Sequence, residues 1–488
     1  MKIKLLLLFV LITSNSISQG VNNLWLMGYE CCVPNFSGMN IDFSSGSFNL
    51  TMVNRGMSID CTNGQICDSS GNLLFYTNGI YVANMLDDTM MNGSGLNPGV
   101  FTTQRTDHGL TIPQANLVLP VPGEINKYYL FHETCDDYGL SYATFYLYYS
   151  IIDMSLDGGL GAVTQKNSVL LQDTLVDGRL TATKHANGRD WWLFAHKDFS
   201  SLMFKFLITP NGIQGPFVQD LITYRGHDFG QTVFSQDGSK FAYYETVNDL
   251  DIWDFDRCTG EFSNLIHITI NDSMPTGGCA FSPSGRFLYV SSTNYLYQFD
   301  TQASNVPASQ TTVGIYDGTV SGFQANFYLS QLAPDGKIYI NCANGTKVMH
   351  VINSPDSLGS ACDFCQHCIA LPAYNAFTIP NSPNYFLGAE SGTMCDSLTN
   401  DVTHIRQQKQ LPYLFPNPAK DILYVSGIEG KLLAADLINS VGEIVKPSTE
   451  FINSNEYLKV DISELTTGIY MLRISENGRV YNLKFFKY

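Results

Sequence analysis

Seven histidine and carboxylate residues are the first candidates for chemistry in this sequence, because each lies at or beside the end of a short apolar segment. Such side chains can hold a divalent metal ion or transfer protons when several of them face one cavity. They are His132, Glu133, His185, His196, His227, Asp228 and Glu245. No two of them have a spacing that is diagnostic of a metal site. The simpler interpretation is that each one closes a hydrogen bond inside the fold.

Short motifs for nucleophilic, zinc or phosphate chemistry are missing from the sequence. It contains no Gly-x-Ser-x-Gly turn, no Gly-x-x-x-x-Gly-Lys-Ser/Thr loop and no His-Glu-x-x-His motif. We therefore predict no catalytic residue and no cofactor. The alternative is a divalent metal held where the seven candidates would meet, at one mouth of a central channel.

The first 18 residues have the features of a secretory signal peptide. Lys2 and Lys4 give a positive start, residues 5–12 are all apolar, and small residues precede Gln19. A retained membrane anchor is the alternative, but it would need about twenty apolar residues. We expect export, and we expect no transmembrane segment in the remainder of the chain.

Export would place the twelve cysteines in an oxidising compartment, which favours disulfide bonds. Cys61 and Cys67 flank a turn and could staple a hairpin. Residues 362–368 hold three cysteines with metal-like spacing around His367, so a zinc site is the alternative there. The disulfide candidates are Cys61, Cys67, Cys362, Cys365, Cys368 and Cys395.

An internal repeat predicts the strands and turns that would position the seven candidate residues. A glycine turn followed by an aromatic or aliphatic strand recurs at steps of 47 to 65 residues, and a further short strand follows most copies. Strand, tight turn and strand at this period are typical of a WD40-like propeller blade. The repeated glycines are Gly71, Gly123, Gly188, Gly238, Gly285 and Gly336.

Six copies leave one strand-like stretch at each end, residues 24–28 and 384–388. We expect these two stretches to pair and to complete a seventh blade, which would also remove exposed strand edges. An open β-solenoid is the alternative, although its repeats are usually shorter.

The chain is therefore predicted to be all-β, a seven-bladed β-propeller followed by a small immunoglobulin-like β-sandwich. The expected boundaries are residues 1–18 for the signal peptide, 19–398 for the propeller, 399–410 for a polar linker and 411–488 for the sandwich. The last segment shows short alternating strands, which suit an antiparallel sandwich.

The charge of the chain is uneven. The net charge is −17, but the last 78 residues hold eight Lys and Arg against nine Asp and Glu, so the propeller and linker carry about −18 once the two signal lysines are set aside. Nucleic acid needs a basic partner, so this balance excludes it as a ligand. An anionic membrane surface is disfavoured for the same reason.

Four motifs follow one another in the tail: LFPNPAKDILYV from Leu414, INSVGEIV from Ile438, VDISELTTGIYMLRI from Val460 and KFFK from Lys484. In order and spacing they resemble the type A C-terminal sorting domain of the type IX secretion system of Bacteroidetes-type bacteria. An ordinary binding sandwich is the alternative. The resemblance implies recognition by the secretion machinery after folding in the periplasm, followed by release or surface attachment. Its motif residues are Pro416, Asn417, Pro418, Gly442, Gly468, Tyr470, Lys484 and Lys487.

The region before the linker resembles the secreted propeller proteins of such bacteria, through DSSGNLLFYTNG from Asp68, LTATKHANGRDWW from Leu180 and LPAYNAFTIPNSPNYFLGA from Leu371. This resemblance implies a fold and a surface location but no reaction. We expect a binding protein that recognises an extracellular protein or glycan, through the loops at residues 84–107 and 362–383. The alternatives are a metal-dependent propeller hydrolase or lactonase and a structural component of the surface layer.

Overall fold

The computed structural model describes residues 20–29, 37–46, 48–137, 142–226, 228–396, 412–415, 417, 419–426, 432–446, 452–453, 458–476 and 479–488. The expected signal peptide, the expected linker, His227, Pro416 and Pro418 lie outside this part of the chain. In the described part, no helix is long and apolar enough to cross a membrane.

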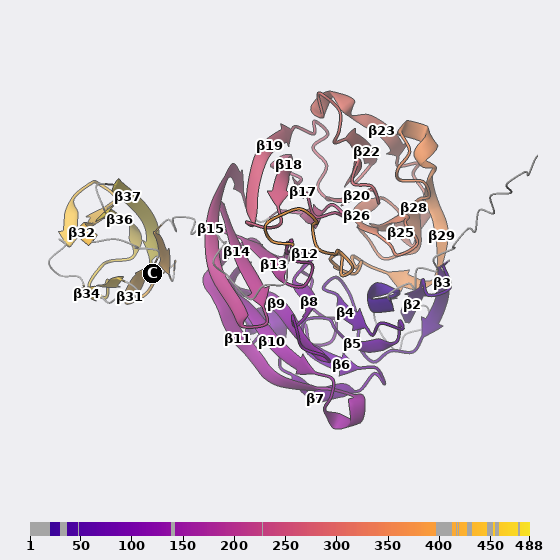
Figure 1. Ribbon diagram of the computed structural model, residues 1–488, viewed down its shortest axis with the longest axis horizontal. Helices are drawn as coiled ribbons and strands as arrows, with labels where there is room; N and C mark the ends of the chain where they lie inside the picture. Colours follow the sequence, from indigo (N-terminus) through magenta and orange to yellow (C-terminus); the bar gives the residue numbers. More distant parts are fainter. Residues whose placement is uncertain are drawn as a thin grey trace, which may run out of the picture.

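Seven blades of antiparallel strands form a ring (Figure 1). The first blade has three strands, β1 (Leu24–Met27), β2 (Gly38–Asp42) and β3 (Asn49–Val53). The second and third blades contain β4 (Gly64–Cys67), β5 (Leu73–Thr77), β6 (Tyr81–Asn84), β7 (Thr89–Ser94), β8 (Asn116–Pro120), β9 (Lys127–Asp137), β10 (Tyr142–Asp153) and β11 (Ala162–Leu175). A single parallel pairing of β7 with β11 joins these two blades into one eight-stranded sheet.

Four further blades complete the ring, and each has four strands in sequence order. The fourth and fifth contain β12 (Thr181–Lys184), β13 (Trp191–His196), β14 (Ser200–Thr209), β15 (Gly212–Arg225), β16 (Gly230–Phe234), β17 (Lys240–Glu245), β18 (Asp249–Asp256) and β19 (Glu261–Ile268). The sixth and seventh contain β20 (Gly277–Phe281), β21 (Phe287–Ser292), β22 (Tyr295–Asp300), β23 (Thr311–Ile315), β26 (Phe327–Leu332), β27 (Ile338–Cys342), β28 (Thr346–Ile352) and β29 (Phe364–Asn375).

Short elements connect the blades without adding a layer. A small hairpin precedes the seventh blade, and each of the described helical turns is three or four residues long. They are η1 (Gly20–Asn22), α1 (Val100–Thr103), η2 (Asp157–Gly159), η3 (Pro307–Ser309), β24 (Val320–Ser321), β25 (Phe323–Gln324) and η4 (Gly359–Cys362).

The glycine repeat is confirmed as the turn between the first and second strands of blades two to seven. All six glycines have positive φ, between 71° and 90°. An L side chain is strained in this region, so glycine is the residue that lets the chain reverse here. The six turns lie on one side of the ring, which we call the turn face; the other side is the opposite face.

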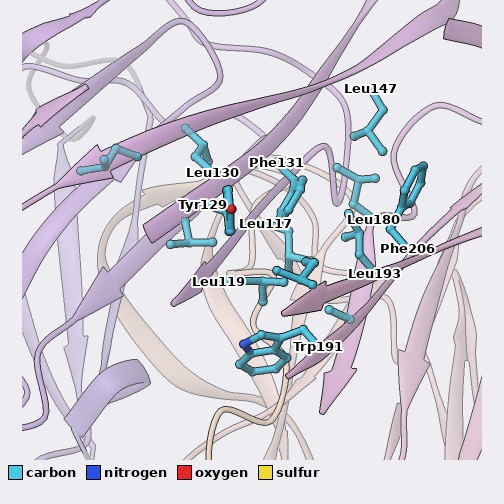
Figure 2. Packing of buried hydrophobic residues seen from close by; sticks show 14 of the residues in the cluster. Leu117, Leu119, Tyr129, Leu130, Phe131, Leu147, Leu180, Trp191, Leu193 and Phe206 are labelled. Carbon is cyan, nitrogen blue, oxygen red and sulfur yellow. The ribbon is translucent and has the colours of Figure 1, made fainter. Parts of the chain in front are cut away.

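Neighbouring blades bury their apolar faces against each other. Figure 2 shows one such contact, where Leu117 and Leu119 of β8 and Phe131 of β9 lie with Trp191 and Leu193 of β13. All five side chains are fully buried. Because a four-stranded blade has two apolar faces and little thickness, this radial stacking supplies the core that one blade alone lacks.

The first blade closes the ring, but the predicted pairing of residues 24–28 with 384–388 is wrong. Within the described part of the chain β1 pairs with β2 alone, and residues 384–388 form no strand. The other edge of β1 is taken by side chains from the second blade: Leu26 N donates to Gln65 Oε1 (2.7 Å) and Asn63 Nδ2 donates to Leu26 O (2.7 Å). A fourth strand would need these same backbone groups.

The C-terminal part is a sandwich of two four-stranded sheets, as predicted. One sheet has the order β30-β31-β35-β34 and the other β33-β32-β36-β37. Leu423, Leu437, Val460, Leu472 and Phe485 form part of their shared core. The strands are β30 (Tyr413–Phe415), β31 (Ile422–Ser426), β32 (Leu432–Asn439), β33 (Ile444–Lys446), β34 (Ile452–Asn453), β35 (Leu458–Asp461), β36 (Gly468–Glu476) and β37 (Arg479–Lys487).

Ring closure should depend on Trp25, whose ring contacts Phe43 (centroids 5.0 Å apart) and Tyr339 of the seventh blade (5.8 Å). We expect Trp25→Ala to lower the free energy of unfolding by about 3–5 kcal/mol, because it leaves a cavity between the first and last blades. Denaturant titration measures the change. Met52→Ala, at an exposed position of β3, is the control and should change stability by less than about 0.5 kcal/mol. Equal effects of the two substitutions would contradict this account of closure.

Candidate functional site

The axis of the ring is occupied by the chain itself. After β29, residues 376–388 run from the opposite face to the turn face, and Figure 1 shows this orange segment at the middle of the ring. Asn381 Nδ2 donates to Leu180 O ahead of β12 (2.9 Å), and Asn384 Nδ2 donates to Gln236 O beyond β16 (2.7 Å). We call residues 376–388 the axial segment. It explains why 384–388 are not available as a blade strand.

Side-chain amides fill much of the space that the axial segment leaves. Gln231 Oε1 accepts hydrogen bonds from Cys279 N and Ser330 N, both at 3.0 Å, and its Nε2 donates to Ser330 O (2.8 Å). Gln114 bonds to both backbone groups of Thr232 at 2.9 Å. The cavity that remains between the inner strands and residues 381–384 is about 50 Å³. That volume admits only one or two water molecules.

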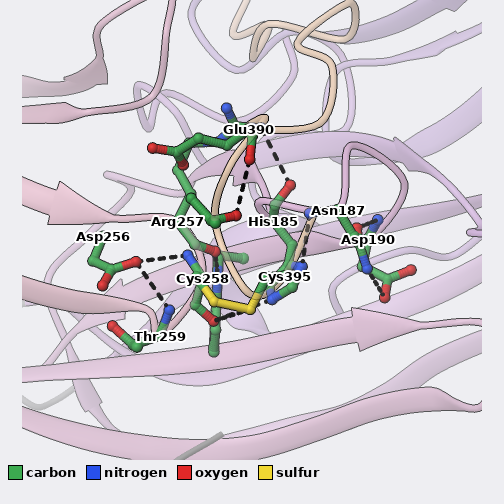
Figure 3. The surroundings of a disulfide bond; sticks show 11 residues. His185, Asn187, Asp190, Asp256, Arg257, Cys258, Thr259, Glu390 and Cys395 are labelled. Carbon is green, nitrogen blue, oxygen red and sulfur yellow. Dashed lines mark hydrogen bonds between the residues drawn. A yellow bond between two sulfur atoms is a disulfide. The ribbon is translucent and has the colours of Figure 1, made fainter. Parts of the chain in front are cut away.

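The axial segment is also tied down beyond the ring axis (Figure 3). Cys395 forms a disulfide with Cys258, which lies in the turn between β18 and β19. Arg257 Nη2 donates to Gly388 O (2.6 Å), and Glu390 N donates to the main chain of the fourth blade (2.8 Å). The end of the segment is thus fixed to the turn face by a covalent bond and by hydrogen bonds.

His185 belongs to this turn-face cluster and does not reach the other candidates. Its Nε2 donates to Cys258 O (3.1 Å), and its Nδ1 accepts from Asn187 N (3.1 Å). Burial lowers the pKa of His185, so the imidazole is held neutral. Both ring nitrogens are in use, which leaves neither for a metal ion.

His132 and Glu133 lie in β9, inside the third blade. The ring nitrogens of His132 bond to Asn97 Oδ1 (2.7 Å) and Ser150 Oγ (2.9 Å), and burial lowers the pKa of His132 to about 3. Glu133 accepts a hydrogen bond from Gly178 N, and burial raises the pKa of this carboxyl. The two side chains hold neighbouring strands and loops together, as the simpler interpretation predicted.

His196, Asp228 and Glu245 do lie in one region, at the opposite face between the fourth and fifth blades. Glu245 accepts from Asn248 Nδ2 (2.8 Å) and lies 3.6 Å from the guanidinium of Arg225. Burial raises the pKa of Glu245, while Arg225 opposes that shift. His132 and His185 lie outside this region, so the alternative in which all seven candidates meet at one mouth does not describe these two residues.

Other contacts in this opposite-face region tie part of its charged groups to the fold, while both ring nitrogens of His196 and Oε1 of Glu245 are buried without a hydrogen-bond partner among the described residues. Asp228 Oδ2 accepts from Thr246 Oγ1 (2.7 Å), and its backbone oxygen accepts from the guanidinium of Arg179. Arg225 also contacts Asp251, a further buried carboxylate. Among the residues that the structure describes, no group of three or more His, Cys, Asp or Glu side chains could hold a metal ion.

The cysteine predictions are corrected in part. Cys365 and Cys368 are bonded to each other, but Cys61, Cys67 and Cys362 are buried free thiols. Strand β4 ends at Cys67 and is extended at roughly 3.3 Å per residue, so it holds Cys61 and Cys67 apart. Burial raises the pKa of Cys67 to about 12, which keeps this thiol protonated and unreactive.

A pocket of about 540 Å³ opens on the turn face, beside the exit of the axial segment. The sequence did not predict this pocket, because its walls come from turns that are far apart along the chain. The one usable signal was Pro380 and Pro383, which argue against a strand at 384–388 and for an irregular segment. The walls include Asn22, Asn23, Gln236, Pro283, Gln331, Pro334, Pro383, Asn384 and Phe386.

The described sorting-motif residues hold the sandwich together. Asn417 Nδ2 donates to Lys484 O (3.2 Å), and Asn417 Oδ1 accepts from Phe486 N (3.0 Å), which fixes the first motif to β37. Tyr470 OH donates to Thr466 O (2.9 Å). Gly442 adopts φ +93° in a tight turn, while Gly468 pairs with Lys487 at the end of the β36–β37 hairpin.

Residues 413–487 match the family model of the secretion system C-terminal sorting domain. The chain therefore carries the export address that its tail motifs predicted, and the protein is secreted or placed at the outer cell surface. No curated protein matches the sequence.

Several solved structures resemble the ring at low identity. A putative 6-phosphogluconolactonase from Bacteroides fragilis is 12% identical, with a TM-score of 0.41, over 74% of this chain and 98% of that one. The β-propeller domain of Cps50 from Myceliophteria thermophila is 9% identical, with a TM-score of 0.34, over 63% and 87%. A gluconolactonase from Xanthomonas campestris is 10% identical, with a TM-score of 0.30, over 65% and 92%. Such similarities concern the fold alone.

The disulfide between Cys258 and Cys395 should stabilise the folded protein more than the disulfide between Cys365 and Cys368. Cys258 and Cys395 are 137 residues apart, whereas Cys365 and Cys368 are three apart. Because stabilisation by a cross-link grows with the loop it closes, we expect Cys258→Ser/Cys395→Ser to lower the free energy of unfolding by about 2–5 kcal/mol. Cys365→Ser/Cys368→Ser is the matched control and should cost clearly less in the same denaturant titration. The reverse order would contradict the anchoring role.

Buried neutral histidines should make the fold sensitive to acid. The pKa of His196 is lowered from 6.5 to about 3 by burial, with a smaller effect of Arg225. The unfolded state therefore takes up a proton that the folded state refuses, so stability is lost as pH falls from about 6.5 towards 3. We expect His196→Phe to reduce the pH dependence of unfolding in this window by about 1.4 kcal/mol per pH unit, the value for one proton. An unchanged slope, measured by denaturant titration from pH 6.5 to pH 4, would show that His196 does not titrate this way.

Proposed function

We propose that this protein is an extracellular binding protein, exported by the type IX system, whose propeller recognises a glycan or a protein without covalent chemistry. The supporting observation is the turn-face pocket of about 540 Å³, which remains open while the axis of the ring is filled. Ligand pockets usually measure about 300–1,000 Å³. A pocket on a rigid ring is well suited to recognition because binding orders few additional groups.

The hydrogen bonds of three of the candidate residues support binding over catalysis. His132 and His185 have both ring nitrogens bonded within the protein, and Glu133 holds a backbone amide. A general acid or base must reach a substrate proton, directly or through one water. These three side chains are hydrogen-bonded within the propeller, and none of the three residues lines the turn-face pocket.

The loop at residues 84–107 offers a second contact surface. Met85, Leu86, Met91 and Val100 on it are about half exposed or more. Exposed methionine and leucine side chains are adaptable apolar contacts for a protein partner. We expect this loop to add to recognition when the ligand is a macromolecule.

Binding by the exported full-length protein tests the proposal. Glycan arrays and intact cells of the producing type supply the ligands, and a chelator is added in parallel. We expect saturable binding that persists with the chelator, because recognition rests on hydrogen bonds and apolar contact. Turnover of esters or lactones that the chelator abolishes would favour the hydrolase alternative. Absence of saturable binding, with the protein abundant in surface-layer extracts, would favour the structural one.

A further inference from the structure

The turn-face pocket has an unusual wall: it is rich in carboxamides. Asn22, Asn23, Gln236, Gln331 and Asn384 all line it. A carboxamide both donates and accepts hydrogen bonds, which matches the hydroxyl group of a ligand better than it matches a charge. The wall is assembled from η1 and the residue after it, from the end of β26, from the turns after β16, β20 and β26, and from the axial segment.

The described residues that line the pocket include no charged side chain. The nearby acidic residues are turned onto their own loops: Asp237 accepts from Ser239 N (3.0 Å), and Asp335 accepts from Lys337 N (3.1 Å) and Tyr339 OH (2.8 Å). A charged ligand would lose its hydration here without gaining a counter-charge, which is unfavourable. The net charge of −17 further disfavours an anion.

The carboxamides differ in how firmly they are held. Asn384 is fixed through Nδ2 to Gln236 O (2.7 Å) and through Oδ1 from Phe386 N (3.0 Å). Gln331 Nε2 makes only long bonds, at 3.3 and 3.4 Å, to carbonyl oxygens on its own strand and the axial segment. Asn22 Oδ1 is buried without a hydrogen-bond partner among the described residues. The site therefore holds both fixed groups and groups with bonding capacity to spare.

An apolar surface lies beside these amides. Phe386 is 40% exposed and lines the pocket together with Pro283, Pro334 and Pro383. A pyranose ring presents C–H groups on its faces and hydroxyls at its rim, so one face can lie on a phenyl ring while the rim meets the amides.

We infer that the turn-face pocket binds a neutral saccharide unit of an extracellular glycan. This inference rests on the proposed binding function and gives it a ligand class. A peptide is the competing ligand, but peptide sites rely on an exposed strand edge, an apolar helix groove or several aromatic side chains around a proline-rich segment. Here the described wall offers one exposed phenyl ring and five side-chain amides.

The test measures binding of neutral oligosaccharides to the full-length protein by calorimetry. The probes are cellohexaose, mannohexaose and laminarihexaose, with hexagalacturonic acid as the charged counterpart and a proline-rich peptide as the other class. We expect at least one neutral probe to bind with a dissociation constant of about 1 mM or tighter. Phe386→Ala/Gln331→Ala should weaken that binding at least about tenfold.

Phe323→Ala/Gln324→Ala is the matched control. It removes the same two side-chain types from an exposed hairpin that precedes β26 and lies on the opposite face, so it should leave affinity unchanged. Thermal unfolding of both variants checks that each remains folded. An affinity lost in the control but kept in the pocket variant would place the site elsewhere and overturn the inference.

The outcomes separate the two levels of the proposal. Binding of only the acidic oligosaccharide or only the peptide would overturn the neutral-saccharide inference and leave the binding function standing. Absence of binding to these probes, with saturable binding to intact cells retained, has the same meaning. Failure of both experiments would overturn the binding function together with the inference.

Discussion

The hydrogen bonds between the axial segment and the inner strands are the interactions on which the rest of the structure depends. Asn381 and Asn384 bond to main-chain carbonyls of different blades, and Tyr385 OH bonds to Val118 O while its ring meets Trp191. A propeller axis is lined with backbone groups that need partners once water is excluded. The axial segment supplies those hydrogen-bond partners. In doing so it fills the central channel of the ring.

Filling the axis also decides where function can reside. His132 is hydrogen-bonded on both ring nitrogens, burial lowers the pKa of His132 and of His196, and Glu245 lies beside Arg225. What remains accessible is the rim of the ring, above all the amide-lined pocket at the turn face. An acidic protein with an uncharged pocket suits the neutral ligand that we propose, since its net charge disfavours anions and its pocket offers cations no counter-charge.

Local sequence patterns predicted most of the fold but little of the candidate site. Glycines such as Gly238 and Gly285 predicted the blade turns because positive φ is a local requirement, and the tail strands followed from alternation in the same way. The particular partner of His132 could not be predicted, because Asn97 lies 35 residues away, in the loop after β7. Residues 384–388 were misjudged because their aromatic residues suit a strand, whereas Asn63 and Gln65 had already taken the edge such a strand would need.

The position of the axial segment in the chain determines when the propeller can reach its final structure during export. Residues 376–396 are the last part of the ring to be synthesised, and they stand immediately before the region that leads to the sorting domain. The bond between Cys258 and Cys395 requires an oxidising compartment, so the ring reaches its final form only after the whole propeller has left the cytoplasm. A chain that ends before residue 376 would lack both the axial segment and the sorting domain. The axial segment and the sorting domain both follow the last blade strand, so a chain that reaches the sorting domain also contains the axial segment.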